Sequence, residues 1–362
     1  MNQKKQILIV FGGCSTEYNV SLESAHSVLQ VLDQNRFTPL MVGITREGRW
    51  LRYQGDLSHL ERGDWQEQPS CVPCSLSQDR GSLQLLWLDG SGKHEHFDAV
   101  FPILHGKNGE DGTLQGLLEL IGAPIIGCGS LSSALCMDKN RAHKLAALAG
   151  VKVPRSRLFR RGTVLSQVIS AAEELRYPLF VKPVRAGSSF GITQVTVPDQ
   201  LPPAVEVAFQ HDREILLEEA IPGFDEQVLV EQSISGFEVG CAVMGNEDLT
   251  VGALDEIELA QGFFDYREKY NLITSRIHCP ARISPEKTGE IQETAKAIYR
   301  ALDCRGFARV DFFLTPEGVI VFNEVNTIPG FTAHSRYPGM MAAIGWEFAA
   351  LVNHLVELGV EV

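Results

Sequence analysis

Two short runs near the C-terminus carry the polar residues with the clearest chemical potential. ARVDFFL (308–314) and VIVFNEVN (319–326) are strand-like and are joined by a Thr-Pro-Glu-Gly turn, which predicts a β-hairpin. Side chains alternate between the two faces of a strand. One face is therefore expected to carry the polar residues Arg309, Asp311, Glu324 and Asn326. The core face is expected to carry Val310, Phe312, Val321 and Val325.

The pairing within this hairpin follows from the position of its turn. A turn centred on the Pro-Glu dipeptide sets Arg309 opposite Glu324 and Asp311 opposite Phe322. Carboxylate and amide oxygens on a stiff hairpin suit Mg²⁺, which fills its remaining positions with water and phosphate oxygens. A nucleoside triphosphate is then the natural companion. The alternative is a solvated face on which Arg309 and Glu324 form an ordinary ion pair.

A glycine- and serine-rich loop, Arg185–Gly191, joins two apolar runs within residues 177–197. Its small residues allow backbone N–H groups to approach phosphates closely. The loop lacks a Walker signature and joins two strands, so we expect a flap that covers phosphates rather than a cradle at a helix end. Lys182 and Lys139 could add positive charge; the alternative for each is an ordinary surface lysine.

Two further glycine-rich stretches, GGCSTEYNVSLES (12–24) and HGKNGEDGTLQG (105–116), each follow an apolar strand-like run. Small ligands of open α/β sheets lie beyond the carboxyl ends of the strands. Both stretches are therefore candidate substrate walls. The first does not match GxGxxG, so we do not interpret it as a dinucleotide fingerprint.

The elements that must position these residues begin with an alternating pattern. Strands are expected at 6–13, 38–45 and 98–106, and helices from Ser21 and over 113–122. This pattern predicts an α/β domain with a parallel sheet, whereas residues 54–97 show no sustained period. Later expected elements are one helix from near Ser130 to Gly150, a hairpin over 177–197, a helix from Ser284 to about Asp303, and a helix at about 340–358.

A short internal repeat interrupts the second half of the chain. ILLEEAIPGFDE (215–226) reappears 13 positions later as VLVEQSISGFEV (228–239). Two short copies are too few for a solenoid, so the repeat indicates a tandem insertion into one strand-turn unit. Which copy occupies the strand stays open.

Composition excludes several classes of protein. The 362 residues include 45 acidic against 32 basic side chains, a net charge of -13, so nucleic acid is not an expected partner. The sequence contains no membrane-spanning apolar run and no signal-peptide pattern at its start, which predicts a cytoplasmic protein. The eight scattered cysteines predict reduced thiols, and Cys71 and Cys74 are interpreted as part of a surface turn rather than a zinc site.

Over essentially its whole length the chain resembles the D-alanine:D-alanine ligase family of ATP-grasp enzymes. The motifs that carry the resemblance, in the family's order, are HGKNGEDGTLQG, MDK (137–139), FVKPVRAGSSFGI (180–192), FDYREKY (264–270), ARVDFF and FNEVNTIPGFT (322–332). Three stretches are most similar to vancomycin-resistance D-alanine:D-serine ligases of the VanG type: SSALCMDKNRAHK, GFFDYREKYNLITS and HSRYPGMM (334–341).

The resemblance implies an α/β and α+β architecture. An N-terminal α/β substrate domain (1–127) would precede a two-part ATP-grasp fold. The central subdomain (128–230) would carry the phosphate-covering hairpin, and the C-terminal domain (231–362) the magnesium site and a lid from Gly262 to about Ser275. The resemblance also implies a homodimer.

The resemblance further implies roles for individual residues. ATP would be bound by Lys139, Lys182, Ser189, Glu231, Glu238 and Lys269, and two Mg²⁺ (or Mn²⁺) ions by Asp311, Glu324 and Asn326. Glu17 would bind the ammonium of the first D-alanine, with His105 beside it, and Ser188 and Tyr270 would close the site. Arg309 and the Gly330 N–H would bind the oxyanion. Ser335 and Arg336 would meet the second substrate. If the first repeat copy fills the strand, Glu218 replaces Glu231.

The reaction implied is amide formation in two steps. A D-alanine carboxylate attacks the γ-phosphorus of ATP, and the amine of a second D-amino acid then attacks the acyl phosphate. D-serine is the expected second substrate, D-alanine its rival, and D-lactate the least expected. Two alternatives stay open: another ATP-grasp ligase with different acids, and a nucleotide-binding regulatory protein that has lost turnover.

Overall fold

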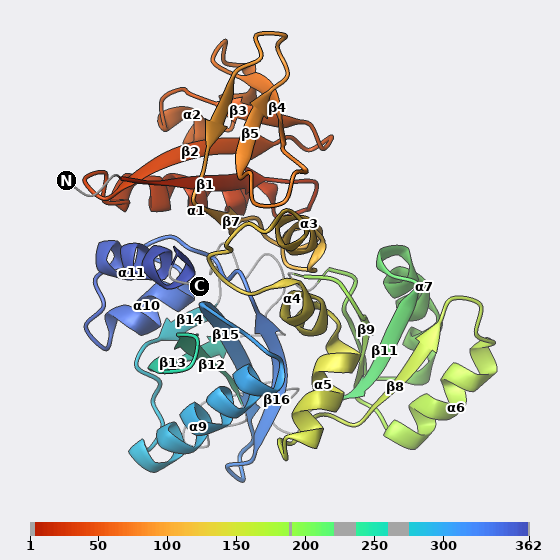
Figure 1. Ribbon diagram of the computed structural model, residues 1–362. Coiled ribbons are helices and arrows are strands. Elements are labelled where there is room, and N and C mark those ends of the chain that lie inside the picture. The colour runs from red at the N-terminus through yellow and green to blue at the C-terminus, as the bar shows by residue number, and fades with distance from the viewer. Residues whose placement is uncertain (1–3, 188–189, 221–236, 260–274, 361–362) are drawn as a thin grey trace.

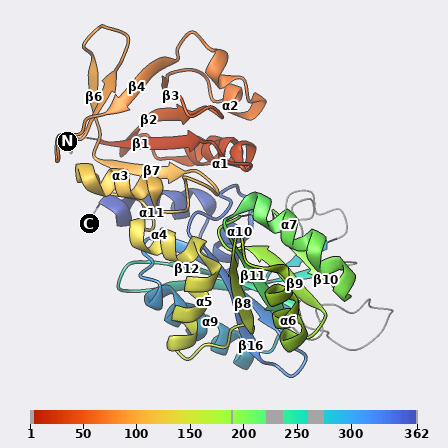
Figure 2. The same ribbon diagram turned by 90° about the vertical axis from the view of Figure 1, so that its right-hand side faces the viewer.

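The computed structural model describes residues 4–187, 190–220, 237–259 and 275–360. These residues form three sheets, with the strand orders β6-β5-β4-β3-β2-β1-β7, β10-β9-β11-β8 and β14-β13-β12-β15-β16. Figure 1 shows the seven-stranded sheet at the top and the two smaller sheets below it, on either side of helices α4 and α5. The turned view in Figure 2 shows that β7 forms the edge of the large sheet nearest the rest of the chain.

The centre of the large sheet is parallel, as predicted. β1 (Lys5–Gly12) pairs with β2 (Phe37–Ile44) on one side and β7 (Ala99–Ile103) on the other. The interior of β1 is a continuous apolar run because both of its faces are covered. One face packs against α1 (Tyr18–Val31) and the other against α3 (Thr113–Ile121).

The rest of this sheet is antiparallel, which the sequence did not predict. Four short strands extend the sheet: β3 (Trp50–Tyr53), β4 (Val72–Leu76), β5 (Gln84–Trp87) and β6 (His94–His96). The same stretch contains α2 (Ser58–Arg62) and a 3₁₀ turn at Trp65–Glu67. These strands are only three to five residues long, so their alternation is too brief to produce a clear sequence signal.

The single helix expected from Ser130 to Gly150 is two helices, α4 (Ser130–Met137) and α5 (Lys139–Leu148). The break lies at Asp138, whose backbone is extended and whose side chain accepts a hydrogen bond from the Arg141 N–H. An aspartate that caps a new helix competes with continuation of the old one. The break places Lys139 at the first position of α5.

The four-stranded sheet contains the expected hairpin. β9 (Leu179–Pro183) pairs antiparallel with β10 (Thr193–Val195), on either side of the glycine-rich loop. The remaining elements of this unit are β8 (Ser156–Arg160), β11 (Glu214–Glu219), α6 (Leu165–Leu175), the 3₁₀ turn Pro198–Gln200 and α7 (Leu201–His211). The start of the first copy of the repeat, residues 215–219, lies in β11. Residues 221–236, which contain most of the second copy, lie outside the described residues.

The five-stranded sheet is antiparallel throughout. Its strands are β12 (Phe237–Met244), β13 (Thr250–Leu259), β14 (Ser275–His278), β15 (Phe307–Leu314) and β16 (Ile320–Asn326). α9 (Pro285–Ala301) packs on one face of this sheet, and its bounds nearly match those of the predicted helix. The predicted C-terminal helix is instead α10 (Arg336–Ala342) and α11 (Phe348–Val360), interrupted near Gly345.

Two smaller predictions concern the whole chain. None of the helices described is long and apolar enough to cross a membrane. All eight cysteines are free thiols. Cys74 is buried within β4, so its predicted place in a surface turn was wrong, and burial raises the pKa of the Cys71 thiol to about 11 and that of Cys74 to about 12.

Candidate active site

The β15–β16 hairpin gathers the predicted polar face, although in a different register. Arg309 pairs with Asn326 and Asp311 with Glu324. The predicted pairing of Arg309 with Glu324 and of Asp311 with Phe322 was wrong. The register shifts immediately after Asp311, where β16 accommodates one extra residue as a β-bulge.

The bulge also changes which apolar side chains share a face. Val310, Phe312 and Val325 belong to the core that packs against α9, as predicted. Val321 instead packs with Phe313, so its predicted place was wrong. An extra residue reverses the alternation beyond it, and this reversal moves Val321 to the side of the polar residues.

Asp311 is the centre of the polar face and is almost completely buried. Arg309 donates two parallel hydrogen bonds to it, from Nε to Oδ1 and from Nη2 to Oδ2, both at 2.8 Å. Asn326 Nδ2 donates to Asp311 Oδ2 at 2.9 Å. With the amide nitrogen of Asn326 bonded to Asp311, its amide oxygen is left to accept another partner.

Arg336, predicted to meet the second substrate, is the cation of a buried charged cluster. It donates to both carboxylate oxygens of Asp255, at 2.7 and 2.8 Å, and to Glu238 at 3.0 Å, and lies 3.5 Å from Asp311. Burial alone would raise the pKa of Asp255, but the Arg336 guanidinium outweighs it and lowers that pKa. Gly240 lies next to this pair, and the position favours glycine because a Cβ there would be 2.5 Å from Arg336 Nη2.

Ser335 and Gly330, predicted for the second substrate and the oxyanion, lie side by side. A Cβ built on Gly330 would be 3.2 Å from Ser335 Oγ. That oxygen accepts a hydrogen bond from the Thr332 N–H at 3.1 Å, which fixes the turn before α10. The structure thus brings Gly330, Ser335 and Arg336 to one end of the polar face.

Lys139 connects the polar face with the glycine-rich loop. Its ammonium donates to the backbone carbonyl of Ala186 at 2.9 Å and lies 3.5 Å from Glu324. The next residue, Gly187, approaches Glu17 so closely that a Cβ on it would lie 2.9 Å from Glu17 Oε2. A chain of contacts therefore runs from the carboxylates of the hairpin to the N-terminal sheet.

Lys182 and Glu218 form a buried ion pair between β9 and β11. The second carboxylate oxygen of Glu218, Oε2, and the neighbouring His143 Nδ1 have no hydrogen-bond partner among the described residues. Glu218 belongs to the first copy of the repeat, so this copy supplies the glutamate that pairs with Lys182, whereas Glu231 lies outside the described residues. Glu238 lies instead at the start of β12, against Arg336.

Glu17 and His105 meet at the carboxyl end of the parallel strands, as expected for the walls of a ligand site. A Cβ built on Gly106 would be 2.2 Å from Glu17 Oε2. His105 Nδ1 lies 2.8 Å from the Ile328 carbonyl and Nε2 3.0 Å from Ser24 Oγ, an arrangement that suits a neutral ring donating from Nδ1. Burial lowers the pKa of His105, although the nearby Glu17 carboxylate opposes this effect.

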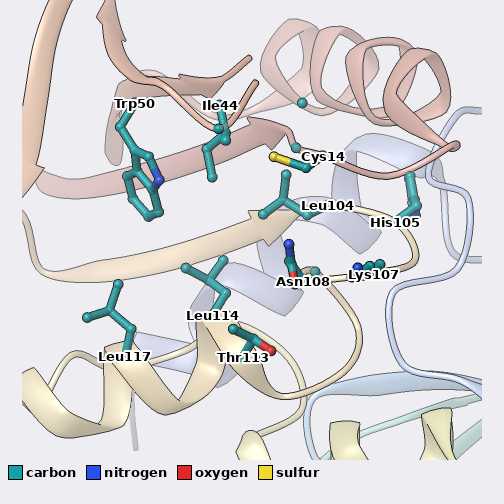
Figure 3. A pocket seen from close by; sticks show the side chains of 14 residues that line it. Cys14, Ile44, Trp50, Leu104, His105, Lys107, Asn108, Thr113, Leu114 and Leu117 are labelled. Carbon is teal, nitrogen blue, oxygen red and sulfur yellow. The ribbon is translucent and has the colours of Figure 1, made fainter. Parts of the chain in front are cut away.

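Next to these residues lies a cavity of about 340 Å³ (Figure 3). Both predicted wall loops contribute to its lining, with Cys14 from one and Asn108 from the other, and Trp50, Leu104 and Leu114 make much of the lining apolar. Glu17 does not line it. The cavity therefore adjoins the predicted D-alanine site rather than coinciding with it.

Sequence reasoning missed two buried carboxylates. Asp255 holds Arg336, and Glu110 binds backbone N–H groups of two separate loops. Isolated acids in a strand and in a glycine-rich loop gave no signal, because their partners are remote in the sequence. Five predicted residues lie outside the described residues, as does almost all of the predicted lid: Ser188, Ser189, Glu231, Lys269 and Tyr270.

Comparison with known families gives matches to nearly the whole chain. The family described as "D-ala D-ala ligase N-terminus" matches residues 6–128, and "D-ala D-ala ligase C-terminus" matches residues 145–225 and 220–357. The second match is split, and its two parts overlap within the first copy of the repeat, which agrees with a duplicated segment.

Individual relatives cover the same extent. The vancomycin B-type resistance protein VanB of Enterococcus faecalis is 43% identical, over 99% of both chains. A D-alanine–D-alanine ligase of Caldicellulosiruptor bescii is 39% identical, over 99% of this chain and 96% of its own. The crystal structure of the VanG D-Ala:D-Ser ligase of Enterococcus faecalis is 51% identical, with a TM-score of 0.89 over 98% of this chain and 99% of its own. The predicted ATP-grasp architecture is confirmed.

Proposed function

Because the chain belongs to the D-alanine–D-alanine ligase family, we propose that it uses ATP to join D-alanine to a second D-amino acid, with D-serine preferred. The observation that carries this proposal is the line of contacts from Glu324 through Lys139 and the glycine-rich loop to Glu17. It supports the proposal because a group suited to a D-alanine ammonium would then lie near groups suited to phosphates and a divalent cation.

In the first step a carboxylate oxygen of D-alanine forms a bond to the γ-phosphorus of ATP, and ADP leaves. Glu17 holds the ammonium of this D-alanine, and Lys139 and Lys182 bind ATP phosphates. Glu218 or Glu231 and Glu238 bind the nucleoside, and Ser189 and Lys269 complete the phosphate site. Catalysis of this kind depends on positioning and charge stabilisation more than on covalent help from the protein.

The hairpin residues fit a magnesium site. Asp311, Glu324 and Asn326 offer hard oxygen donors on adjoining strands, and the amide oxygen of Asn326 is oriented away from its hydrogen bond to Asp311. We assign two Mg²⁺ ions, or Mn²⁺, to these residues. The metal would offset negative charge on the transferring phosphoryl group.

In the second step the amine of the second D-amino acid attacks the acyl carbon, loses a proton, and inorganic phosphate leaves. Arg309 and the backbone N–H of Gly330 donate to the developing oxyanion. In this proposal Tyr270 and Ser188, which lie outside the described residues, would close the site and keep water from the acyl phosphate.

The preference for D-serine rests on the polarity of the second-substrate end. Arg336 binds Asp255 and Glu238, and Ser335 lies beside Gly330, so hydrogen-bonding groups gather at the end proposed for the second substrate. A site built to bind a hydroxyl discriminates against the analogue that lacks it more strongly than a merely roomy site. The similarity to the VanG D-Ala:D-Ser ligase supports the same preference. D-alanine is the alternative second substrate.

A competition experiment tests this proposal. The protein is incubated with ATP, Mg²⁺, D-alanine and equal amounts of D-serine and D-lactate, and the products are identified by mass spectrometry. D-alanyl-D-serine is expected to exceed D-alanyl-D-alanine and the depsipeptide. ATP hydrolysis that stays at background in all mixtures would contradict the ligase assignment, and predominance of D-alanyl-D-alanine would identify a housekeeping enzyme instead.

In the cell this activity would supply peptidoglycan precursors and support glycopeptide resistance. We place the protein in the cytoplasm as a homodimer that acts on small molecules, not on nucleic acid or membranes. Sedimentation analysis tests the dimer: a single species of 39.9 kDa would contradict it.

A further inference from the structure

Glu110 joins two loops that are far apart in the sequence. Its Oε2 accepts a hydrogen bond from the Gly106 N–H at 2.8 Å, and its Oε1 accepts one from the Ile328 N–H at 2.9 Å. The side chain is buried, so both hydrogen bonds are shielded from water. Ile328 is 218 positions away in the sequence and follows the hairpin that carries the proposed metal site.

The same loop also holds the other side of Ile328. His105 Nδ1 lies 2.8 Å from the Ile328 carbonyl oxygen, so the N–H and the C=O of this one residue are both bound by the segment 105–110. Ser24 Oγ, which contacts His105, accepts a further hydrogen bond from the Phe331 N–H at 3.2 Å. The turn from Ile328 to Phe331 is thus fixed by side chains of the N-terminal unit.

The position of Ile328 decides where neighbouring groups lie. Asn326, a proposed metal ligand, is two residues before it, and Gly330, the proposed oxyanion donor, is two residues after it. Pro329 stands between Ile328 and Gly330, and its ring fixes one of the few torsions that connect them. Orienting the Ile328 peptide therefore restricts the direction of the Gly330 N–H.

The other end of the link reaches the first-substrate site. Gly106, whose N–H binds Glu110, lies directly against the Glu17 carboxylate. Its φ of +71° is one that residues with a side chain disfavour. Glu110 thus holds, with one carboxylate, both the loop against Glu17 and the loop that carries the oxyanion donor. A carboxylate suits this role because each of its oxygens accepts a hydrogen bond.

We propose that Glu110 is a positioning residue that sets the Gly330 N–H relative to the D-alanine held by Glu17. Glu110 does not touch the reacting atoms and acts through Gly106 and Ile328. The inference rests on the proposed function, because it gives Glu17 and Gly330 their roles. The link itself is a property of the free protein and can be measured without any substrate.

Glu110→Gln tests this role with almost no change in shape. A glutamine has one acceptor oxygen and one NH₂ group, so one of the two backbone N–H groups must face another donor. Asp111→Asn is the matched control. Asp111 also accepts two backbone N–H hydrogen bonds, from Asn108 and Thr113, but both partners belong to its own loop.

Hydrogen exchange followed by mass spectrometry, at about pH 9 where the Glu110 carboxyl is ionised, measures the link in the free protein. The peptide that contains Ile328 is expected to exchange about tenfold faster in Glu110→Gln than in the wild type. The same peptide should be unchanged in Asp111→Asn, and peptides from β1 should be unchanged in both. Equal protection of Ile328 in all three proteins would overturn the proposed link.

Kinetics at about pH 9, where the Glu110 carboxyl is ionised, measure the consequence. Glu110→Gln is expected to lower kcat at least about tenfold, because small displacements of catalytic groups are costly, while the KM for ATP stays within about twofold. Asp111→Asn should keep kcat within about twofold of the wild type. Equal kcat values in the two variants, or a KM for ATP that rises as much as kcat falls, would overturn the positioning role.

Poor folding of Glu110→Gln would not block the test. Glu110→Asp keeps two acceptor oxygens on a shorter side chain and is expected to recover part of the kcat lost in Glu110→Gln; no recovery would count against the proposal. If wild type, Asp111→Asn and Glu110→Gln all make no dipeptide, the proposed function fails, while the exchange comparison still decides whether the link exists.

Discussion

Arg336 donates hydrogen bonds to both carboxylate oxygens of Asp255, and each side chain is at least nine-tenths buried. The same guanidinium also reaches Glu238 on β12 and approaches Asp311 on β15. Three strands of the sheet are thereby tied to the first residue of α10. A change at Asp255 should consequently affect both the stability of the protein and the proposed second-substrate end.

We expect Asp255→Ala to lower the free energy of unfolding by about 3 to 5 kcal/mol, because it leaves the Arg336 charge buried without its main partner. Urea denaturation followed by circular dichroism measures this loss. The nearby Glu258→Ala is the control: Glu258 pairs with Arg282 and both side chains are about half exposed, so its removal should cost about 1 kcal/mol or less. Equal losses in the two variants would contradict the importance of the buried cluster.

The duplicated segment leads to a second prediction. Glu218, in the first copy, forms a buried ion pair with Lys182, so we expect Glu218→Gln to raise the KM for ATP at least about tenfold. Glu231→Gln, the equivalent change in the second copy, should alter this KM by less than about threefold. Both values come from steady-state kinetics at saturating D-alanine and D-serine.

The reverse result, a large effect of Glu231→Gln and a small one of Glu218→Gln, would assign the nucleotide to the second copy. A deletion of residues 219–231 provides a further comparison, because it joins Glu218 directly to Gln232 and leaves one copy of the repeat. The deleted protein is expected to keep ATP-dependent activity. A folded but inactive deletion variant would show that the first copy alone is insufficient.

Features encoded within a few neighbouring residues were predictable from the sequence. Alternation along two strands was enough to put Arg309, Asp311, Glu324 and Asn326 on one face, and the structure confirms that face. The exact pairing was not predictable because an extra residue in β16 shifts the register after Asp311. Accommodation of that residue depends on the packing of the whole sheet rather than on the turn.

Contacts between segments remote in the sequence could not be predicted either. Glu110 and Ile328 are 218 positions apart, and Asp255 and Arg336 are 81 positions apart, so no local pattern joins them. The break at Asp138 is different, since aspartate is a known helix-capping residue. There the apolar spacing suggested one continuous helix, and the local hydrogen bond to the Arg141 N–H prevailed.

Glu110 also leads to a prediction on pH. Burial raises the pKa of Glu110 to about 8, with a further contribution from Glu17, partly offset by the Gly106 and Ile328 N–H groups and by Arg309. Below this pH the carboxyl carries a proton and loses acceptor capacity. The rate of the first step, measured as isotope exchange within ATP with D-alanine as the only amino acid, should therefore rise as pH increases through 8.

The Glu110→Gln variant should lack this rise, because its amide does not titrate. Its exchange rate should be low and nearly constant from pH 7 to 9, apart from any dependence that it shares with the wild type through D-alanine itself. Asp111→Asn should keep the wild-type profile. Parallel profiles for all three proteins would assign the titration to another group.

Arg309 has two roles that one pair of substitutions can separate. As an oxyanion donor it should contribute to the second step, and as the partner of Asp311 it should orient a proposed metal ligand. Arg309→Ala removes both contributions, so we expect kcat to fall by about 10² to 10³ at saturating Mg²⁺. Arg309→Lys keeps the charge but not the two parallel hydrogen bonds, and should recover only part of that loss. If Arg309→Ala reaches the wild-type kcat at Mg²⁺ concentrations above those that saturate the wild type, Arg309 serves the metal site alone and the oxyanion role is wrong.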